Sequence, residues 1–307
     1  MSQSILPRIA RVKVVRKCFG HPFLVANEWI WNRLPDSFTM ARPLRAYGSF
    51  LHYLIRLRSA RLQRHGTYFL RNRPELELIR TLLSQRPPES ALNVAVLACS
   101  NGAEVYSILW TIRSARPDLK VRLHAIDISR EVVEIAQKGA YPLKGHDMVH
   151  SAIFERLSED EMFSMFDRVN GELRIKPWIK EGIDWRVGDA TNPAMATLLG
   201  PQDMVVANNF LCHMPPQDAE RCLRNVARLV SPGGYLFVSG IDLDIRTKIA
   251  LDSGWTPVQN SLEEIHNGDP SVRQDWPWQY WGLEPFDSER QDRNVRYASV
   301  FQLNHRG

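Results

Sequence analysis

Four polar side chains follow directly after apolar runs, which is where the strands of a parallel sheet present residues to a ligand. Asp127 ends the run LHAID, Asp189 ends IDWRVGD, and Asn208 and Asn209 follow DMVVA. A carboxylate at a strand end can accept hydrogen bonds from both hydroxyls of a ribose, and it repels a 2′-phosphate. At the next strand end, Asp189 could accept a bond from an adenine amino group. The pattern favours an adenosine ligand; the alternative for Asp127 is a cap on the helix that begins near Ser129.

The turn that precedes these residues has one glycine where a dinucleotide site needs about three. In VLACSNGAEVYSILW, residues 96–110, an apolar strand leads through Gly102 into a helix. Several glycines let a pyrophosphate approach the helix start, whereas a single glycine suits a ligand without phosphate. S-adenosylmethionine is such a ligand. Glu104 lies just past the turn, where its carboxylate could face the ammonium or sulfonium charge of that ligand.

The elements that must position these residues alternate as strands and helices. Strands are predicted over 92–99, 120–129, 183–189, 203–209 and 234–240, and helices over 103–115, 130–140 and 216–231. Continuous apolar strands indicate a parallel sheet that is covered on both faces. The alternation predicts a doubly wound, Rossmann-like α/β sheet, with ligands at the carboxyl ends of its strands. Residues 142–183 break the rhythm and could form a small β-subdomain, with an antiparallel hairpin within 172–185.

The chain is predicted to divide into a basic helical domain, residues 1–85, and a ligand-binding domain, residues 86–307. Residues 1–73 contain fourteen Lys and Arg, but only Glu28 and Asp36 as acids. This asymmetry indicates an anionic partner, which could be an acidic protein, nucleic acid or the acidic remainder of the chain. Tight nucleic-acid binding is not expected, because the arginines alternate with Leu, Tyr and Phe at helical spacing, so that many lie on a packed face.

Composition indicates a soluble protein of a reducing compartment. Hydrophobic residues make up 44% and charged residues 24% of the chain, and no apolar run reaches the roughly 18 residues that cross a membrane. The first residues lack the apolar stretch of a secretion signal. Cys18, Cys99, Cys212 and Cys222 form no CxxC pair, so neither a metal site nor a disulfide framework is expected. A cytoplasmic location is the simplest interpretation.

Four segments together resemble the chemotaxis receptor methyltransferases of the CheR type: GTYFLRN, LACSNGAEVYSI, AIDISREVVEIAQKGAY and MVVANNFLCHM. The similarity runs from about Thr67 to Gly240 in the correct order and spacing. Its most specific element is a cysteine-serine-any-glycine block followed by Glu-any-Tyr-Ser, present here as Cys99–Ser100, Gly102, Glu104 and Tyr106–Ser107.

The resemblance implies a seven-stranded methyltransferase sheet, S-adenosylmethionine as cofactor, S-adenosylhomocysteine as product, and methyl transfer. By position, Thr67 and Arg71 match the family residues that cover the cofactor, and Asp127 matches its ribose ligand. The expected cofactor-binding residues are Thr67, Arg71, Ala98, Ser100, Gly102, Glu104, Asp127, Ile128, Asp189, Ala190 and Asn208. The expected catalytic residues are Arg71, Asn209 and His213.

The sequence departs from the family beside the methyl acceptor. The family's Arg-Asn pair is Asn208-Asn209 here, and the tyrosine four residues beyond that pair's Asn is His213. A carboxylate acceptor is ionised at neutral pH and needs no base, whereas a hydroxyl acceptor needs one, and histidine is suited to that work. The change therefore favours a hydroxyl acceptor; the alternative is a histidine that hydrogen-bonds within the turn before Pro215.

Four functions remain open at this point. The first is an O-methyltransferase acting on a small-molecule or carrier-bound hydroxyl or carboxylate, and the second is a protein-glutamate methyltransferase of chemotaxis-like signalling. The third, a nucleic-acid methyltransferase, is disfavoured because Phe210-Leu211 follow Asn209 where an amino-directed enzyme usually has Pro-Pro-aromatic. The fourth is a non-catalytic module that binds S-adenosylmethionine.

One aromatic-rich stretch, RQDWPWQYWGLEPF, is not covered by the resemblance. It concentrates four large aromatic residues, Trp276, Trp278, Tyr280 and Trp281, within six positions. We expect these side chains to form core for the last strands of the sheet. The alternative is an apolar wall or lid around an aromatic or lipid-like acceptor.

Overall fold

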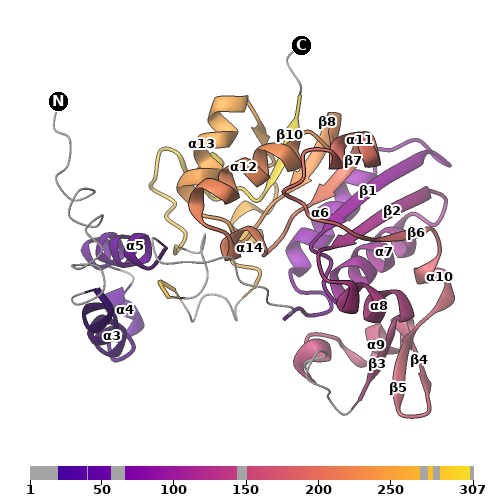
Figure 1. Cartoon of the computed structure of the whole chain (residues 1–307), viewed down its shortest axis with the longest axis horizontal. Coiled ribbons are helices and arrows are strands. Elements are labelled where there is room, and N and C mark those ends of the chain that lie inside the picture. Colours follow the sequence, from indigo (N-terminus) through magenta and orange to yellow (C-terminus); the bar gives the residue numbers. More distant parts are fainter. Residues whose placement is uncertain are drawn as a thin grey trace.

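A seven-stranded sheet forms the centre of the protein (Figure 1). The computed structural model describes residues 20–39, 41–56, 66–143, 151–269, 276–278 and 284–304. The strand order is β6-β2-β1-β7-β8-β10-β9; β6 to β8 pair in parallel, and β10 is antiparallel to both β8 and β9. The strands of this sheet are β1 (Ala91–Leu97), β2 (Lys120–Asp127), β6 (Ile183–Val187), β7 (Gln202–Val206), β8 (Val230–Phe237), β9 (Thr256–Pro257) and β10 (Val300–Leu303).

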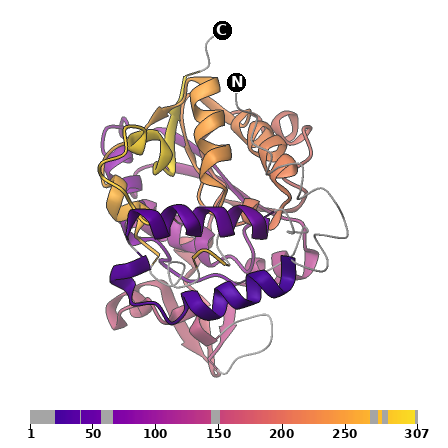
Figure 2. The same cartoon turned by 90° about the vertical axis from the view of Figure 1, so that its left-hand side faces the viewer.

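Helices cover both faces of the sheet, which confirms the doubly wound α/β fold that the sequence predicts (Figures 1 and 2). Those of the sheet domain are α6 (Arg73–Leu83), α7 (Ala103–Ala115), α8 (Arg130–Lys138), α10 (Pro177–Lys180), α11 (Met195–Leu199), α12 (Pro216–Ala227), α13 (Leu243–Ser253), α14 (Leu262–His266) and α16 (Arg293–Arg296). Two short 3-10 helices, η1 (Ser151–Phe154) and η2 (Leu211–His213), and the helix α9 (Glu159–Met165) complete this part.

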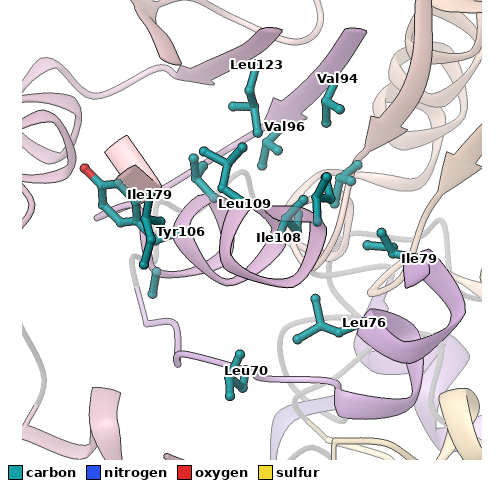
Figure 3. Close-up of a cluster of buried hydrophobic side chains, with 14 of the residues drawn as sticks. Leu70, Leu76, Ile79, Val94, Val96, Tyr106, Ile108, Leu109, Leu123 and Ile179 are labelled. Carbon is teal, nitrogen blue, oxygen red and sulfur yellow. The ribbon is translucent and has the colours of Figure 1, made fainter. Parts of the chain in front are cut away.

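The residues of β1 alternate between two cores. Val94 and Val96 lie in the core that also contains α6 and α7, while Ala95 and Leu97 lie in the core that contains α12 and α13. Successive side chains of a strand point to opposite faces, so an unbroken apolar strand is the expected sequence when both faces are covered. Figure 3 shows the first of these cores, in which α6 and α7 pack against the central strands. The buried sheet fixes where the strand ends lie, and thus where a ligand can bind.

A separate three-stranded sheet begins just before residues 142–183, the stretch that breaks the alternation, and has its other two strands within it. Its order is β3-β5-β4, with β3 (Ala140–Pro142), β4 (Phe166–Val169) and β5 (Glu172–Ile175). The hairpin is not within 172–185, as the sequence suggested: residues 177–180 form α10, and 183–187 form β6 of the main sheet. Asn170 and Gly171 both have positive φ, 50° and 80°, and Asn-Gly is the preferred two-residue hairpin turn. Pro177 begins a helix, where its missing N–H costs little.

The N-terminal helices form a small core of their own. These are α3 (Gly20–Trp31), α4 (Asp36–Thr39) and α5 (Arg42–Arg56), and they lie to one side of the sheet in Figure 1. Trp276 packs edge-on against Trp31, with 5.4 Å between the ring centroids, and a Cβ at Gly48 would overlap the Trp276 ring. The expectation that Trp276 is core for the last strands is therefore wrong, because it fills the gap between α3 and α5. Tyr280 and Trp281 lie outside the described residues.

The helix α6 packs in the same core as α7 and the sheet, although the sequence groups it with the N-terminal helices. The division into residues 1–85 and 86–307 stays a prediction. Among the described residues, we find no helix that combines the length and the apolar character needed to span a membrane. Cys99, Cys212 and Cys222 are buried free thiols.

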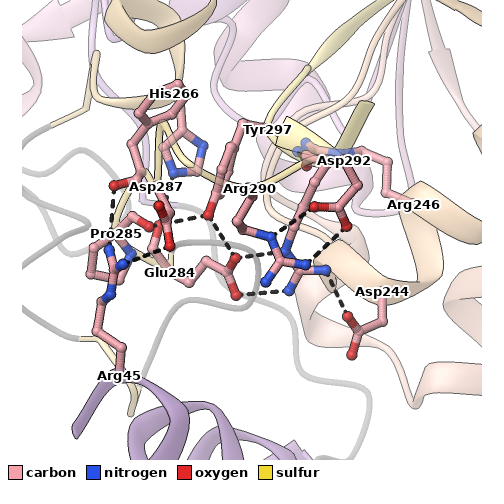
Figure 4. A network of polar contacts seen from close by, with 12 residues as sticks. Arg45, Asp244, Arg246, His266, Glu284, Pro285, Asp287, Arg290, Asp292 and Tyr297 are labelled. Carbon is pink, nitrogen blue, oxygen red and sulfur yellow. Dashed lines mark hydrogen bonds and ion pairs between the residues drawn. The ribbon is translucent and has the colours of Figure 1, made fainter. Parts of the chain in front are cut away.

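A network of charges joins the C-terminal segment to the rest of the chain (Figure 4). The Arg296 guanidinium makes two bonds to the Glu284 carboxylate, of 2.6 and 2.7 Å. Burial alone would raise the pKa of Glu284, but the bonds from Arg296 hold it below its ordinary value. Arg45 of α5 donates to Asp287 at 2.8 Å. The segment that carries Glu284 and Asp287 is thereby anchored to both α16 and α5.

Candidate functional site

The turn between β1 and α7 is held in an uncommon backbone conformation. Ala98, Ser100 and Gly102 have positive φ values of 55°, 49° and 89°. Non-glycine residues in this region cost about 1–3 kcal/mol each, and they persist where surrounding contacts fix them. Here the Ser100 N–H donates to Asp127 Oδ2 at 2.9 Å, and the Cys99 N–H donates to the Ile126 carbonyl at 3.0 Å. The turn is therefore fixed against the end of β2, at the edge of the sheet where ligands bind in this fold.

Gly102 is required by packing as well as by its backbone conformation. A Cβ at this position would lie 3.0 Å from Ala136 Cβ and 3.1 Å from Tyr106 Cε2. The glycine thus allows α7 to approach α8 closely. Its expected role as the point where the backbone approaches a ligand stays a prediction.

We expect Gly102→Ala to destabilise the protein by more than Gly233→Ala does. Both glycines have positive φ, 89° and 77°, but a Cβ at Gly233 would have no neighbour within 4 Å. Gly233→Ala should therefore cost only the backbone term, about 1–2 kcal/mol, while Gly102→Ala adds the overlap with Ala136, of about 1–3 kcal/mol. Urea unfolding of the two variants measures the difference. Equal free energies of unfolding for the two variants would show that α7 and α8 can move apart to accept the added methyl group without loss of stability.

Asp127 holds two backbone groups. Its Oδ2 accepts from the Ser100 N–H, and its Oδ1 accepts from the Ser129 N–H at 3.0 Å, so the cap near Ser129 is present. Its side chain is buried, and each carboxylate oxygen has a second lone pair that could accept from a hydroxyl. The cap and the ribose role are thus compatible. Ile128 beside it is exposed.

Asp189 lies beyond the end of β6, the strand next to β2. Its Oδ1 accepts from the N–H and the hydroxyl of Thr191, at 2.9 and 2.8 Å. Ala190 packs against the core that contains α12. Asp127 and Asp189 therefore lie at the carboxyl ends of neighbouring strands, as an adenosine site requires.

A cavity lies farther along the same edge of the sheet, beyond the end of β7. Four of the expected residues line it: Arg71, Glu104, Asn208 and Asn209. The other expected residues are not among its lining residues: Thr67, Ala98, Ser100, Gly102, Asp127, Ile128, Asp189, Ala190 and His213. Ser107 of the family motif also lines the cavity, and the polar lining residues that the sequence did not single out are Tyr68, Asn72, Glu75, Ser239, Arg246, His266, Asp269 and Ser299.

Asn208 joins the buried carboxyl group of Glu75 to the half-buried carboxyl group of Glu104. Its Nδ2 donates to Glu75 Oε1 at 2.8 Å and to Glu104 Oε1 at 3.0 Å, and its Oδ1 accepts from the Ser239 N–H at 3.0 Å. Both amide hydrogens are thereby used, one for each carboxyl group. The side chain is thus turned into the protein, and it positions Glu75 and Glu104 side by side.

Burial makes these two carboxyl groups hard to ionise. It raises the pKa of Glu75 to about 8, and the charge of Glu104 adds to that rise, while the bond from Asn208 and the charge of Arg71 oppose it. Burial also raises the pKa of Glu104, again opposed by Asn208 and Arg71. A buried carboxyl group without a full counter-charge prefers its neutral form. Near neutral pH the neutral form of Glu75 is therefore favoured.

Arg71 is held at the cavity by an ion pair. Its Nε donates to Asp269 Oδ2 at 2.6 Å, while Arg156 donates to Asp269 Oδ1 at 2.7 Å and to the Arg71 carbonyl at 2.6 Å. The Arg156 guanidinium also lies over the Tyr68 ring, 4.5 Å from its centroid. Asp269, which is 198 positions away in the sequence, thus orients Arg71.

A second cation, Arg246, lines the cavity from α13. Its Nη1 donates to the Val238 carbonyl and its Nη2 to the Arg296 carbonyl, both at 2.9 Å. Burial lowers the pKa of this guanidinium to about 9, so it remains charged at neutral pH. His266, which also lines the cavity, has Nε2 at 2.8 Å from the Glu284 carbonyl oxygen. Arg246 and His266 are thereby tied to the network of Figure 4.

His213 lies on η2, beyond the cavity lining. Its N–H donates to the Phe210 carbonyl at 3.1 Å, and its side chain is half-buried. Thr67, which the sequence predicts to cover the cofactor, is buried. A role for His213 as a base stays a prediction. No group of three or more His, Cys, Asp and Glu side chains among the described residues could hold a metal ion.

The arrangement fits a ligand that carries both a ribose and a positive charge. Asp127 and Asp189 lie at the strand ends on one side of the β1–α7 turn, and Glu75 and Glu104 line the cavity on the other. Glu75 Oε2 is buried and has no hydrogen-bond partner among the described residues. A buried oxygen without a partner is costly in a native protein, and a cationic group of a ligand would satisfy it.

Glu75 has a signal in the sequence. In RPELELIR it falls on the same face as Leu78 and Ile79, so a carboxyl group occurs within an apolar face. Asn72, three residues earlier, caps α6 and accepts from the Glu75 N–H at 3.3 Å. Asn-x-x-Glu resembles a capping box, which is a sufficient local explanation for a Glu at this position. The structure instead has the Glu75 side chain bound to Asn208.

Known proteins of similar sequence are methyltransferases. Residues 65–242 match the family model described as "CheR methyltransferase, SAM binding domain". A chemotaxis protein methyltransferase of Vibrio parahaemolyticus is 28% identical over 147 residues, which cover 46% of this chain and 50% of that protein. A probable biofilm formation methyltransferase, WspC of Pseudomonas aeruginosa, is 23% identical over 197 residues, covering 62% of this chain and 45% of that protein. The chain thus spans about half the length of the curated relatives it matches.

Solved structures of methyltransferases also match. The CMeT domain of the citrinin polyketide synthase is 13% identical, with a TM-score of 0.40, and the match covers 75% of this chain and 52% of that one. An S-adenosylmethionine-dependent methyltransferase of Anabaena variabilis is 15% identical with a TM-score of 0.34, covering 73% of this chain and 72% of that one.

Proposed function

Because this chain belongs to the CheR methyltransferase family, whose matching domain binds S-adenosylmethionine, we propose that it is an S-adenosylmethionine-dependent O-methyltransferase. Its acceptor in this proposal is a hydroxyl group of a small molecule or of a carrier-bound intermediate. The observation that carries the choice of acceptor is the environment of Asn208. This residue stands where the resembling family has an arginine, and its amide is used by Glu75 and Glu104.

The charges around the cavity support a hydroxyl acceptor over a carboxylate. A carboxylate acceptor needs a free cation nearby, because a bare negative charge next to buried carboxyl groups is unfavourable. Arg71 is paired with Asp269, whereas Arg246 is held by two backbone carbonyls and remains a cation at the cavity. A hydroxyl group is neutral when it binds, and it can donate a hydrogen bond to a carboxyl oxygen. The two neighbouring carboxyl groups of Glu75 and Glu104 are what favours a neutral acceptor in this proposal.

The chain's own residues have distinct tasks in this proposal. When bound, the cofactor supplies a methyl group on a sulfonium sulfur. Asp127 holds the ribose at the end of β2, Glu104 faces the positive charge, and Arg71 covers the site while Asp269 orients it. Holding cofactor and acceptor in line supplies much of the rate of such a displacement. The residues at the cavity need mainly to position the acceptor oxygen, and a base, for which His213 is the candidate, receives its proton.

A protein-glutamate methyltransferase is the second candidate, and the similarity to chemotaxis protein methyltransferases favours it. In that case the acceptor would be a glutamate side chain of a receptor, and the basic N-terminal region would bind an acidic protein surface. A non-catalytic module that binds S-adenosylmethionine is the third candidate.

Transfer of a labelled methyl group distinguishes these candidates. The protein is incubated with S-adenosylmethionine labelled with tritium in the methyl group and with an extract separated into proteins and small molecules. Alkali releases volatile methanol from a methyl ester but not from a methyl ether. Alkali-stable label in small molecules supports our proposal, whereas alkali-labile label in proteins supports the second candidate. A protein that binds the cofactor and labels neither fraction would support the third.

The sequence-based role of His213 leads to a prediction on pH. A hydroxyl acceptor must lose a proton, so we expect the rate with the labelled acceptor to rise through an apparent pKa of about 6–7. His213→Gln should lower the rate by about tenfold or more and remove this rise. The measurement is kcat/KM against pH for both proteins, with His124→Gln as a control, because His124 is bound to Asp184 in the sheet. An unchanged profile in His213→Gln would assign the histidine to the turn alone.

A further inference from the structure

We propose that Glu75 is a second carboxylate, beside Glu104, for the positive charge of the cofactor. In this proposal, the binding of S-adenosylmethionine releases the proton that Glu75 shares with Glu104. This inference rests on the proposed function and deepens it. The three residues come from three elements: Glu75 from α6, Glu104 from α7, and Asn208 from the turn after β7. They form one cluster at the wall of the cavity.

The first argument is geometric. Asn208 donates one amide hydrogen to each carboxyl group, at 2.8 and 3.0 Å, so both Oε1 atoms are satisfied and close together. Glu75 Oε2 is buried without a partner among the described residues, and Glu75 lines the cavity. In the part of the chain that the structure describes, the proton of the neutral form lies on Oε2 and has no acceptor, and in the ionised form Oε2 has neither a donor nor a cation, so the cluster is incompletely satisfied in both forms. A group entering the cavity can satisfy it.

The second argument is the balance of charge around Glu75. Glu104 faces Glu75 across Asn208. Arg71 is the cation whose charge lowers the pKa of Glu75, and it is already paired with Asp269. The other charged or titratable groups that line the cavity are Arg246, His266 and Asp269. Two carboxyl groups that share a site cannot both ionise easily. Without a ligand, the cluster therefore keeps a proton at neutral pH, which agrees with the raised pKa of both groups.

The third argument concerns the ligand. S-adenosylmethionine carries a sulfonium and an ammonium group, and its carboxylate balances only one of the two charges. A cation within about 4–6 Å of a carboxyl group favours the ionised form. The two cationic groups are at separate positions in the ligand, so Glu104 can face one of them and Glu75 the other. With Glu75 as a second carboxylate, the cluster can respond to the ligand by losing its proton to the solvent. No other reactant is needed.

This coupling has a defined direction. Below pH 8 the free protein must lose a proton to bind the ligand, so the affinity rises with pH and levels off above the pKa of Glu75, about 8. For a release of one proton the dissociation constant falls by up to about tenfold per pH unit. At pH 7, a group with a pKa of about 8 is about 90% protonated, so the release should approach one proton per ligand bound.

The experiment is calorimetric titration of the full-length protein with S-adenosylmethionine at pH 7. Repeating it in buffers of different ionisation enthalpy gives the number of protons released. Since the amino group of the ligand itself titrates near pH 8, the readout is the difference between wild type and Glu75→Gln. We expect wild type to release about one proton more than Glu75→Gln. Glu77→Gln, on the same helix and largely exposed, should behave as wild type.

Affinities across pH give a second readout. At pH 6, where Glu75 is neutral, wild type and Glu75→Gln should bind S-adenosylmethionine within about twofold of each other. At pH 8.5 we expect wild type to bind about fifty- to a hundredfold more tightly, because the affinity of wild type rises by up to about tenfold per pH unit between pH 6 and pH 8. Circular dichroism and urea unfolding establish that Glu75→Gln is folded.

The outcomes separate the inference from the proposed function. A folded Glu75→Gln that releases as many protons as wild type and shows the same pH dependence overturns the inference. The proposed function fails instead if wild type gives no binding heat and no methyl transfer. Binding with a wild-type excess of about one proton supports both the cofactor assignment and the role of Glu75.

Discussion

Asp127→Ala is expected to weaken S-adenosylmethionine binding by about tenfold to a hundredfold. The ribose hydroxyls would lose their acceptor in a buried site, which costs about 1–3 kcal/mol. The same change leaves the N–H groups of Ser100 and Ser129 without the acceptor that they have at 2.9 and 3.0 Å. The loop that carries Ser100 is thereby loosened, so a loss of stability should accompany the loss of affinity.

Calorimetry on the folded variant separates these two effects. Asp127→Asn retains one carbonyl oxygen, so it should keep part of the loop contacts while losing part of the ribose contacts. Asp189→Ala is a matched aspartate at the next strand end, with its Oδ1 bonded to Thr191, and it tests the adenine contact. Urea unfolding gives the stability of each protein. Wild-type affinity in a folded Asp127→Ala protein would leave Asp127 as a cap and loop anchor only.

Arg71→Ala is expected to lower methyl transfer by about a hundredfold or more. Removing a positioned charged donor from an active site typically costs about a hundredfold or more in rate, whereas the loss of the part-buried pair with Asp269, which keeps Arg156 as its partner, should mainly affect stability. Loss of the Arg71 charge also removes a cation that keeps the pKa values of Glu75 and Glu104 from rising further. Both carboxyl groups would then ionise less readily when the cofactor binds.

Arg73→Ala provides the control for Arg71→Ala. Arg73 lies two residues further on, is half exposed and pairs with Glu161 at the surface, so its loss should change the rate by less than about fivefold. Arg71→Lys keeps the charge but not the Nε bond to Asp269, and an intermediate rate is expected. The measurement is kcat and KM for S-adenosylmethionine with the acceptor identified by labelling. A folded Arg71→Ala enzyme with the wild-type rate would make Arg71 one more basic residue of the N-terminal part.

Local patterns in the sequence predicted most elements of the sheet domain. The helix over 103–115 and the strand beginning at 120 match α7 and β2 as the structure has them. These patterns are reliable because strand and helix periods depend on neighbouring residues. The hairpin is a contrasting case. The sequence pattern places it within residues 172–185, whereas the turn is at Asn170-Gly171, a dipeptide that is itself a hairpin signal.

The position of Trp276 shows where such patterns stop. An aromatic-rich stretch must be buried somewhere, yet its composition does not say against what. The structure packs Trp276 on α3 and α5 through Trp31 and Gly48, which come from the opposite end of the chain. No periodicity within residues 276–281 carries that information.

The sequence by itself determined the α/β fold, the strand ends with Asp127 and Asp189, and the resemblance that names the cofactor. Each of these depends on residues close together in the chain. Only the tertiary structure decided which groups share the cavity. Asn208 bonds Glu75, which is 133 positions away, and Glu104, which is 104 positions away. The ionisation of a carboxyl group depends on its burial and on the charges around it in space, so the chemistry of Glu75 emerges only when α6, α7 and the end of β7 are packed together.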